Sequence, residues 1–131
     1  MNTSLLTILA ICCTLTTTAF TTSSDPWVKL GSRKANMKAD QDEILVTGAK
    51  GTFNALKLTV EETGVMFHRV VVHYRNGTRE VLDIRHRIEA GGETRVLNLK
   101  GRNRIIRRVV FHYQSNPLAD KKAKITLYGR H

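Results

Sequence analysis

The chain has 131 residues, and its 21 lysines and arginines against 11 aspartates and glutamates give a formal net charge of +10 at pH 7. A domain this basic attracts polyanions such as nucleic acid, anionic lipid or acidic envelope polymers, although charge alone names no partner. The two cysteines, Cys12 and Cys13, lie in an amino-terminal segment that we expect to be removed. This excludes disulfides, thiolate metal sites and a cysteine nucleophile from the mature chain.

The first 24 residues contain no charged side chain, and the stretch from Leu5 to Ala19 is apolar or small. This is typical of a secretory signal peptide, although the usual positive charge near the start is missing. The apolar part is shorter than the roughly 20 residues that a membrane-spanning helix needs. Cleavage fits after Ala19 or after Ser24. We expect a signal peptide at residues 1–24, a single domain at residues 25–131, a secreted or periplasmic location, and no transmembrane span after signal removal.

Nearly every segment after the signal alternates apolar and polar residues with a period of two and is rich in Val, Ile, Thr, Phe and Tyr, which is typical of β-strands. Clusters of Gly, Asn and Pro separate the segments. No stretch has the apolar spacing of a long amphipathic helix. The expected strands are Trp27–Leu30, Glu43–Val46, Phe53–Val60, Phe67–Arg75, Thr78–Ile84, Thr94–Leu99, Ile105–Tyr113 and Ala123–Tyr128.

About eight short strands predict an all-β fold, an antiparallel β-sandwich of the jelly-roll type, with an antiparallel barrel as the second choice. The clearest local signal is "HYRNGTREV", in which Asn76 and Gly77 are expected to supply the two positive-φ residues of a tight hairpin. The strands before and after this turn should therefore be antiparallel neighbours.

Two six-residue runs, RVVVHY at 69–74 and RVVFHY at 108–113, differ at one position only. Alternate residues of a pleated strand face opposite sides of the sheet. Strict alternation predicts these core-facing residues: His68, Val70, Val72 and Tyr74 in the first run, and Arg107, Val109, Phe111 and Tyr113 in the second. It predicts these outward-facing residues: Phe67, Arg69, Val71 and His73, and Ile106, Arg108, Val110 and His112.

If the two strands are neighbours, the outward groups Arg69, His73, Arg108 and His112 converge on one surface. Each guanidinium could then bind a phosphate, sulfate or carboxylate through two parallel hydrogen bonds. The alternative is that these are ordinary polar residues on the solvated face of an antiparallel sheet, which is the commoner case. A metal site at His73 and His112 lacks a third ligand at a defined spacing, so we expect no metal and no cofactor.

The densest positive charge lies in "KGRNRIIRR", which contains Lys100, Arg102, Arg104, Arg107 and Arg108. Such a run fits either polyanion contact, with an affinity that falls steeply with salt, or a solvated loop that keeps strand edges from pairing. No aromatic residue is interleaved with these charges, which argues against binding of single-stranded nucleic acid by base stacking.

The acidic residues do not predict a calcium site or a catalytic site. Asp40, Asp42 and Glu43 lack the spacing of an EF-hand loop, so ion pairs with Arg or Lys are a better interpretation than a calcium site. Asp83 and His86 could form an acid–base pair, but no nucleophile motif or glycine-rich phosphate loop accompanies them. The sequence therefore does not predict an enzyme.

Four segments carry a family resemblance: "WVKLGSRK", "FNALKLTVEETGVMFHRVVVHYRNG", "IEAGGETRVLNLKGRNRIIRRVVFHY" and "AKITLYGRH". From Trp27 to His131 the chain resembles a family of small exported bacterial all-β proteins of unknown function, in which a short Leu-Gly strand opens the domain and the final strand ends in Gly and polar residues. The resemblance implies a secreted, single-domain, all-β protein. It assigns no catalytic or binding residue.

We therefore expect a non-enzymatic exported module that binds an anionic partner or envelope polymer through a basic face. The candidate residues are Arg69, His73, Arg108, His112, Lys100, Arg102 and Arg104. One alternative is a carbohydrate-binding module, for which the available aromatic residues are Trp27, Tyr74, Tyr113 and Tyr128, several of them expected in the core. Another is a hydrolase with no recognisable motif.

Overall fold

The computed structural model describes residues 26–35, 40–116 and 118–131, so the expected signal peptide lies outside the described residues. The elements in chain order are β1 (Trp27–Lys34), β2 (Gln41–Leu45), the 3-10 helix η1 (Gly48–Lys50), β3 (Ala55–Glu61), β4 (Val65–Tyr74), β5 (Arg79–Ile88), β6 (Leu97–Asn98), β7 (Ile106–Ser115) and β8 (Lys124–Arg130). All eight expected strands are present. In the described part of the chain, no helix has the length and apolar character needed to cross a membrane.

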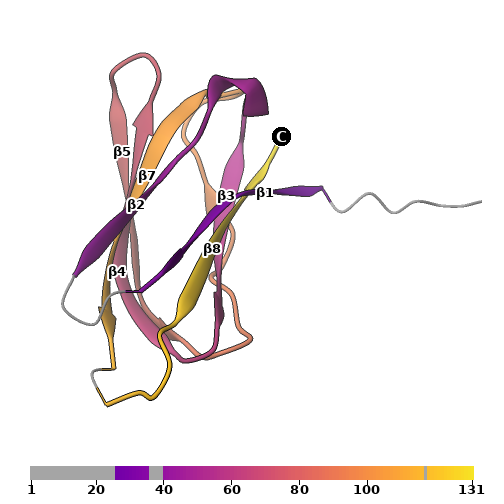
Figure 1. Cartoon of the computed structure of the whole chain (residues 1–131). Helices are drawn as coiled ribbons and strands as arrows, with labels where there is room; N and C mark the ends of the chain where they lie inside the picture. Colours follow the sequence, from indigo (N-terminus) through magenta and orange to yellow (C-terminus); the bar gives the residue numbers. More distant parts are fainter. Residues whose placement is uncertain (1–25, 36–39, 117) are drawn as a thin grey trace, which may run out of the picture.

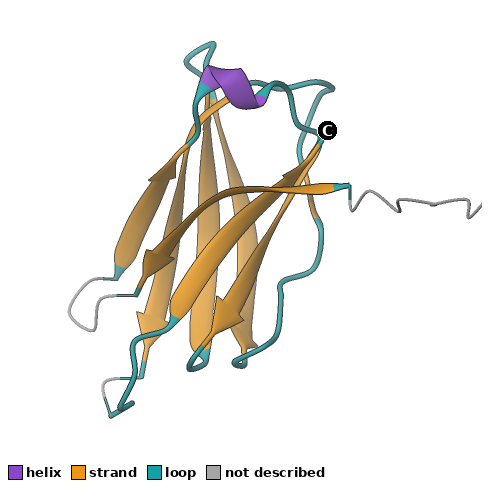
Figure 2. Ribbon diagram, turned by 45° about the vertical axis from the view of Figure 1, so that its right-hand side comes forward, coloured by secondary structure: helices purple, strands orange, loops and turns teal. Residues whose placement is uncertain are grey.

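The strands form two four-stranded sheets that face each other (Figures 1 and 2). Sheet A has the order β1-β8-β3-β6, sheet B has the order β2-β7-β4-β5, and the paired strands are antiparallel. This interleaved order, in which successive strands alternate between sheets at both ends of the chain, is that of a jelly roll. The predicted sandwich is confirmed.

The core lies between the sheets and is filled by the inward residues of both. Sheet B contributes an aromatic cluster in which the ring centroids of Phe67 and Phe111 are 6.4 Å apart and those of Phe111 and Tyr113 are 5.7 Å apart. Sheet A contributes fully buried aliphatic residues, among them Leu58 and Leu127. Burial of each such side chain contributes about 1.5–3 kcal/mol, which makes this layer the main source of stability.

A β-bulge in β4 overturns part of the predicted alternation. Phe67 was expected to face outward and His68 inward, but Phe67 is fully buried and His68 is exposed. The pairing slips between Phe67 and Arg69, so that His68 is an extra residue relative to β7. Such a bulge lets two consecutive side chains face the solvent, and here it places His68 and Arg69 outside while the aromatic ring enters the core.

A second bulge in β7 corrects the prediction for the other run. Ile106 was expected outward and Arg107 inward, but Ile106 is buried and Arg107 is exposed. The pairing passes from His73 opposite Arg108 to Tyr74 opposite Ile106, which leaves Arg107 as the extra residue. The physical reason is the cost of burying an unpaired guanidinium, which greatly exceeds the cost of a local irregularity in the sheet.

The predicted hairpin between β4 and β5 is present, but its predicted turn type is wrong. Of Asn76 and Gly77, only Gly77 has a positive φ, at 91°. The Gly77 amide donates to Tyr74 O (3.1 Å) and the Tyr74 amide donates to Thr78 O (2.9 Å), which closes a three-residue loop. Asn76 instead uses its side chain, because its Oδ1 accepts hydrogen bonds from the Thr78 amide (3.0 Å) and hydroxyl (2.6 Å).

Candidate functional site

The two similar runs lie on neighbouring strands in the middle of sheet B. In the β4–β7 pairing Arg69 is directly opposite His112, and His73 is directly opposite Arg108. Because the strands are antiparallel, the Arg-x-x-x-His pattern of each run places its arginine beside the histidine of the other. All four predicted residues therefore lie on one outer face.

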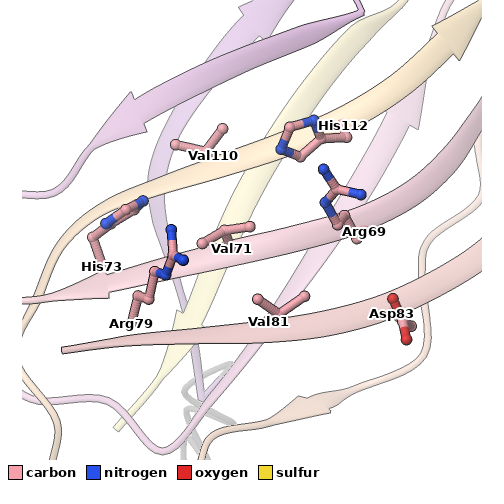
Figure 3. Close-up of a pocket in the computed structure, with 8 residues that line it drawn as sticks. All are labelled: Arg69, Val71, His73, Arg79, Val81, Asp83, Val110 and His112. Atoms are coloured by element: carbon pink, nitrogen blue, oxygen red, sulfur yellow. The ribbon is translucent and has the colours of Figure 1, made fainter.

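Three rows of side chains cross this face from β7 over β4 to β5, and Figure 3 shows eight of their nine residues. One polar row is His112, Arg69 and Asp83; the middle row is Val110, Val71 and Val81; the other polar row is Arg108, His73 and Arg79. Eight of these residues, all except Arg108, line an open hollow of about 520 Å³, which we call the sheet B groove.

The groove has a low apolar floor and longer polar walls. Arg69 and His73 are four residues apart on β4, which separates the two walls by about 13 Å at the strand rise of 3.3 Å per residue. The valines between them are too short to fill this space. A ligand with one apolar surface and anionic substituents at its edges fits such a groove, because the floor accepts the first and the walls the second.

Positive charge concentrates at one end of the groove, around His73. Arg79 and Arg108 are its cross-strand neighbours, and the bulge adds Arg107. Arg108 Nη1 is 3.5 Å from Glu43 Oε2 on β2, while Arg108 Nε is buried and has no hydrogen-bond acceptor among the described residues. At the other end, Asp83 is opposite Arg69 and reduces the positive charge there.

Both groove histidines favour the neutral form. Burial, followed by the charges of Arg108, Arg107 and Arg79, lowers the pKa of His73 below its ordinary value of 6.5. Burial, and then the charge of Arg69, lowers the pKa of His112. Each ring is therefore neutral at pH 7 and offers one donor and one acceptor.

The model of a family described as "Domain of unknown function (DUF2541)" matches residues 5–129. The chain belongs to the DUF2541 family. No curated protein matches it.

A solved structure described as "Structural and functional characterization of Pseudomonas aeruginosa AlgX" is similar to this DUF2541 domain, with a TM-score of 0.52 and 16% sequence identity. The match covers 79% of this chain and 27% of the AlgX chain, so the domain corresponds to about a quarter of that protein's length. At this identity the likeness shows the fold alone.

The basic run of this DUF2541 protein is divided between the end of the groove near His73, where Arg107 and Arg108 lie, and the loop after β6. The Arg104 guanidinium lies over the Tyr74 ring, 3.7 Å from its centroid, and donates hydrogen bonds to Lys100 O (2.8 Å) and Thr78 Oγ1 (3.2 Å). It therefore fixes the loop after β6 onto the β4–β5 hairpin. Lys100 and Arg102 are exposed on that loop and do not line the groove.

Of the three acidic residues Asp40, Asp42 and Glu43, the last two form ion pairs with arginines, as the sequence predicted. Arg33 Nε is 3.9 Å from Asp42 Oδ1, and Glu43 pairs with Arg108. Asp83 and His86 face different partners, since Asp83 is opposite Arg69 and His86 is opposite Phe67. Within the described ranges, no three His, Asp or Glu side chains are placed to hold a metal ion.

The four candidate aromatic residues separate into two pairs. Tyr74 and Tyr113 are buried, whereas Trp27 and Tyr128 are partly exposed on the outer face of sheet A. Lys57 Nζ lies 4.6 Å from the Trp27 ring centroid and 5.9 Å from that of Tyr128. The exposed aromatic residues are therefore on the opposite side of the sandwich from the sheet B groove.

Sequence reasoning missed the contribution of β5, namely Arg79, Val81 and Asp83. The signal was available in the hairpin, because an antiparallel β4–β5 pair with a short turn places alternate β5 residues beside Arg69, Val71 and His73. The apolar floor of the groove could also have been predicted, since the alternation placed Val71 and Val110 on the outward face between charged residues.

Proposed function

We propose that this DUF2541 protein is a non-enzymatic, exported module that binds an anionic polymer across the sheet B groove. The observation that carries the proposal is the set of three arginines, Arg79, Arg107 and Arg108, around His73 at the end of an apolar floor. A sulfate, phosphate or carboxylate group of the polymer would be held there by charge-assisted hydrogen bonds.

The shape of the groove supports an extended ligand. The hollow is open and lies across the flat of the sheet, and it is lined by residues of β7, β4 and β5. A small molecule bound in such an open hollow would leave most of its surface in water. A polymer can instead make further contacts along the groove, from β7 over β4 to β5.

The chemistry of the groove favours binding over catalysis. Its one carboxylate, Asp83, lies opposite Arg69, while the histidines lie on β4 and β7. The eight residues that line the groove include no Ser, Thr, Lys or Tyr that could act as a nucleophile beside a histidine.

The test uses heparin as the polyanion probe. The double variant Arg79→Gln/Arg107→Gln should elute from a heparin column at clearly lower salt than the wild type, and its affinity by calorimetry should fall about tenfold or more. The matched control is Lys29→Gln/Arg87→Gln, which removes the same charge from two exposed residues outside the groove. If both double variants weaken binding equally, retention reflects net charge and the groove has no special role.

Binding of neutral carbohydrate is a second candidate, at a different surface. Trp27 and Tyr128 are partly exposed on β1 and β8, which pair in sheet A, and both rings border Lys57. Exposed aromatic rings stack on sugar rings because both present apolar faces. A glycan-array signal that persists at high salt and disappears in Trp27→Ala would favour this function over the polyanion proposal.

A further inference from the structure

A second hollow lies near the start of β8. This start is at the end of the sandwich opposite the β4–β5 hairpin (Figure 1). The hollow has a volume of about 390 Å³. It is lined by Lys34, Glu62, Lys121, Lys122 and Lys124, and we call it the lysine pocket. It shares no residue with the sheet B groove. Its residues come from the end of β1, the β3–β4 turn, the loop before β8 and the first residue of β8.

The pocket brings like charges together in a way that the fold does not need. Lys34 is directly opposite Lys124 in the β1–β8 pairing, and such like-charged cross-strand pairs destabilise a sheet. Lys121 and Lys122 add two more ammonium groups at the same place.

Nearby carboxylates compensate only in part. Glu61 is opposite Lys124 in the β3–β8 pairing, and Glu62 Oε2 is 3.6 Å from Lys121 Nζ. The Lys121–Glu62 pair is largely exposed, with side-chain exposures of 72% and 48%, so solvent screens it. Four ammonium groups against two carboxylates leave the pocket cationic.

The backbone at this pocket is also unusual. Glu62 has a φ of +77°, in the left-handed region that non-glycine residues rarely adopt. The turn is closed by a hydrogen bond from the Thr63 amide to Glu61 O (3.0 Å). Backbone strain of this kind gathers at ligand sites, where the surrounding structure imposes it. Strain and charge repulsion therefore coincide at one concave surface.

We infer that the lysine pocket is a binding site for a phosphate group. A tetrahedral dianion would neutralise two of the four ammonium groups and remove the repulsion between Lys34 and Lys124. Lysine is suited to this role, since its compact ammonium group carries three donors on a flexible stem and several can converge on one phosphate. The phosphate belongs either to a soluble phosphorylated ligand or to a lipid headgroup, and the two sources share this chemistry.

The test measures the melting temperature in inorganic phosphate and in chloride of equal ionic strength. Phosphate should raise the melting temperature of the wild type more than chloride does. Lys34→Gln should lose the phosphate-specific rise, and Lys124→Gln should lose it as well. The control Lys29→Gln removes one charge from an exposed residue of the same strand outside the pocket, and it should keep the rise.

The proposal is overturned if Lys34→Gln and Lys124→Gln keep the full phosphate response, or if chloride reproduces that response. Because Arg79→Gln/Arg107→Gln leaves the lysine pocket intact, this variant should retain the phosphate response even where it loses heparin. The two proposals therefore fail independently of each other.

Vesicles distinguish the two sources of phosphate. Phosphatidylcholine vesicles that contain phosphatidic acid should sediment the wild type but not Lys34→Gln if the ligand is a lipid headgroup. If only inorganic phosphate acts and the vesicles do not bind the protein, the site serves a soluble phosphorylated ligand.

Discussion

His73 on β4 lies directly opposite Arg108 on β7. Arg79 is opposite the same histidine on the other side, and Arg107 adds a third guanidinium through the bulge in β7. Burial and these positive charges lower the pKa of His73. An anion bound at this end of the groove would offset the same charges. The protonation of His73 and the binding of an anion should therefore be coupled.

Stability should fall on acidification through the ordinary pKa of histidine. His73 and His112 have folded-state pKa values below 6.5, so the unfolded state binds more protons once the pH drops below about that value. Their stabilising contribution is present above pH 6.5 and is lost as the pH falls toward the folded pKa values. Urea unfolding at a series of pH values should show this loss, and the double variant His73→Gln/His112→Gln should show a flatter profile. An unchanged profile in this variant would contradict the assignment.

Anion binding should raise the pKa of His73. A bound sulfate favours the imidazolium form, because it places negative charge beside the ring. Linkage then requires tighter heparin binding at lower pH. NMR titration of the histidine ring signals, with and without a heparin oligosaccharide, measures this directly. His131, which stacks on Phe53 and lies outside the groove, provides an internal reference whose signals should not respond to heparin. A His73 titration curve that heparin leaves unchanged would rule out binding at this end.

The sequence predicted the eight strands and the sandwich because the two-residue period depends only on which side of each strand is buried. It did not predict the two bulges, since pairing between strands decides where an extra residue is accommodated. Both bulges occur where two polar residues are consecutive, at His68-Arg69 and at Arg107-Arg108. Consecutive polar residues inside an alternating strand are therefore the sequence signal that strict alternation overlooked.

The sheet B groove and the lysine pocket differ in how much of each could be predicted from the sequence alone. The repeated Arg-x-x-x-His pattern was sufficient to place Arg69, His73, Arg108 and His112 on one face, given that β4 and β7 are neighbours. The lysine pocket was beyond such reasoning, because Lys34, Glu62 and Lys121 come from three separate parts of the chain. Only the jelly-roll connections bring the end of β1 beside the start of β8.

The groove floor can be tested with a single exposed residue. Val81 is 54% exposed, so Val81→Glu should change the free energy of unfolding by only about 0.5 kcal/mol or less. Its carboxylate would repel an anionic ligand and interrupt the apolar floor, so heparin affinity should fall about tenfold, equal to about 1.4 kcal/mol. Val96→Glu is the matched control, since Val96 is 39% exposed and outside the groove. Equal losses in the two variants would show that only net charge matters.

A buried carboxylate connects the hairpin to the basic loop. The Tyr74 hydroxyl donates to Glu80 Oε1 at 2.5 Å, and the Lys100 amide donates to the same oxygen at 3.0 Å. Glu80 is only 8% exposed, so its side-chain oxygens need hydrogen-bond donors from the protein. Burial and the hydrogen bond to Glu80 raise the pKa of the Tyr74 phenol above its usual range, which keeps the phenol protonated as a donor.

Tyr74→Phe removes one of these donors and should lower the free energy of unfolding by about 1.5–3 kcal/mol, the range for a hydrogen bond to a charged group. Urea unfolding measures the change. Tyr128→Phe is the control, because this partly exposed ring is on the outer face of sheet A and its loss of a hydroxyl should cost about 0.5 kcal/mol or less. Amide exchange at Lys100 should also accelerate in Tyr74→Phe, since Glu80 would no longer be fixed. Equal stability of the two variants would mean that Lys100 alone satisfies the buried carboxylate.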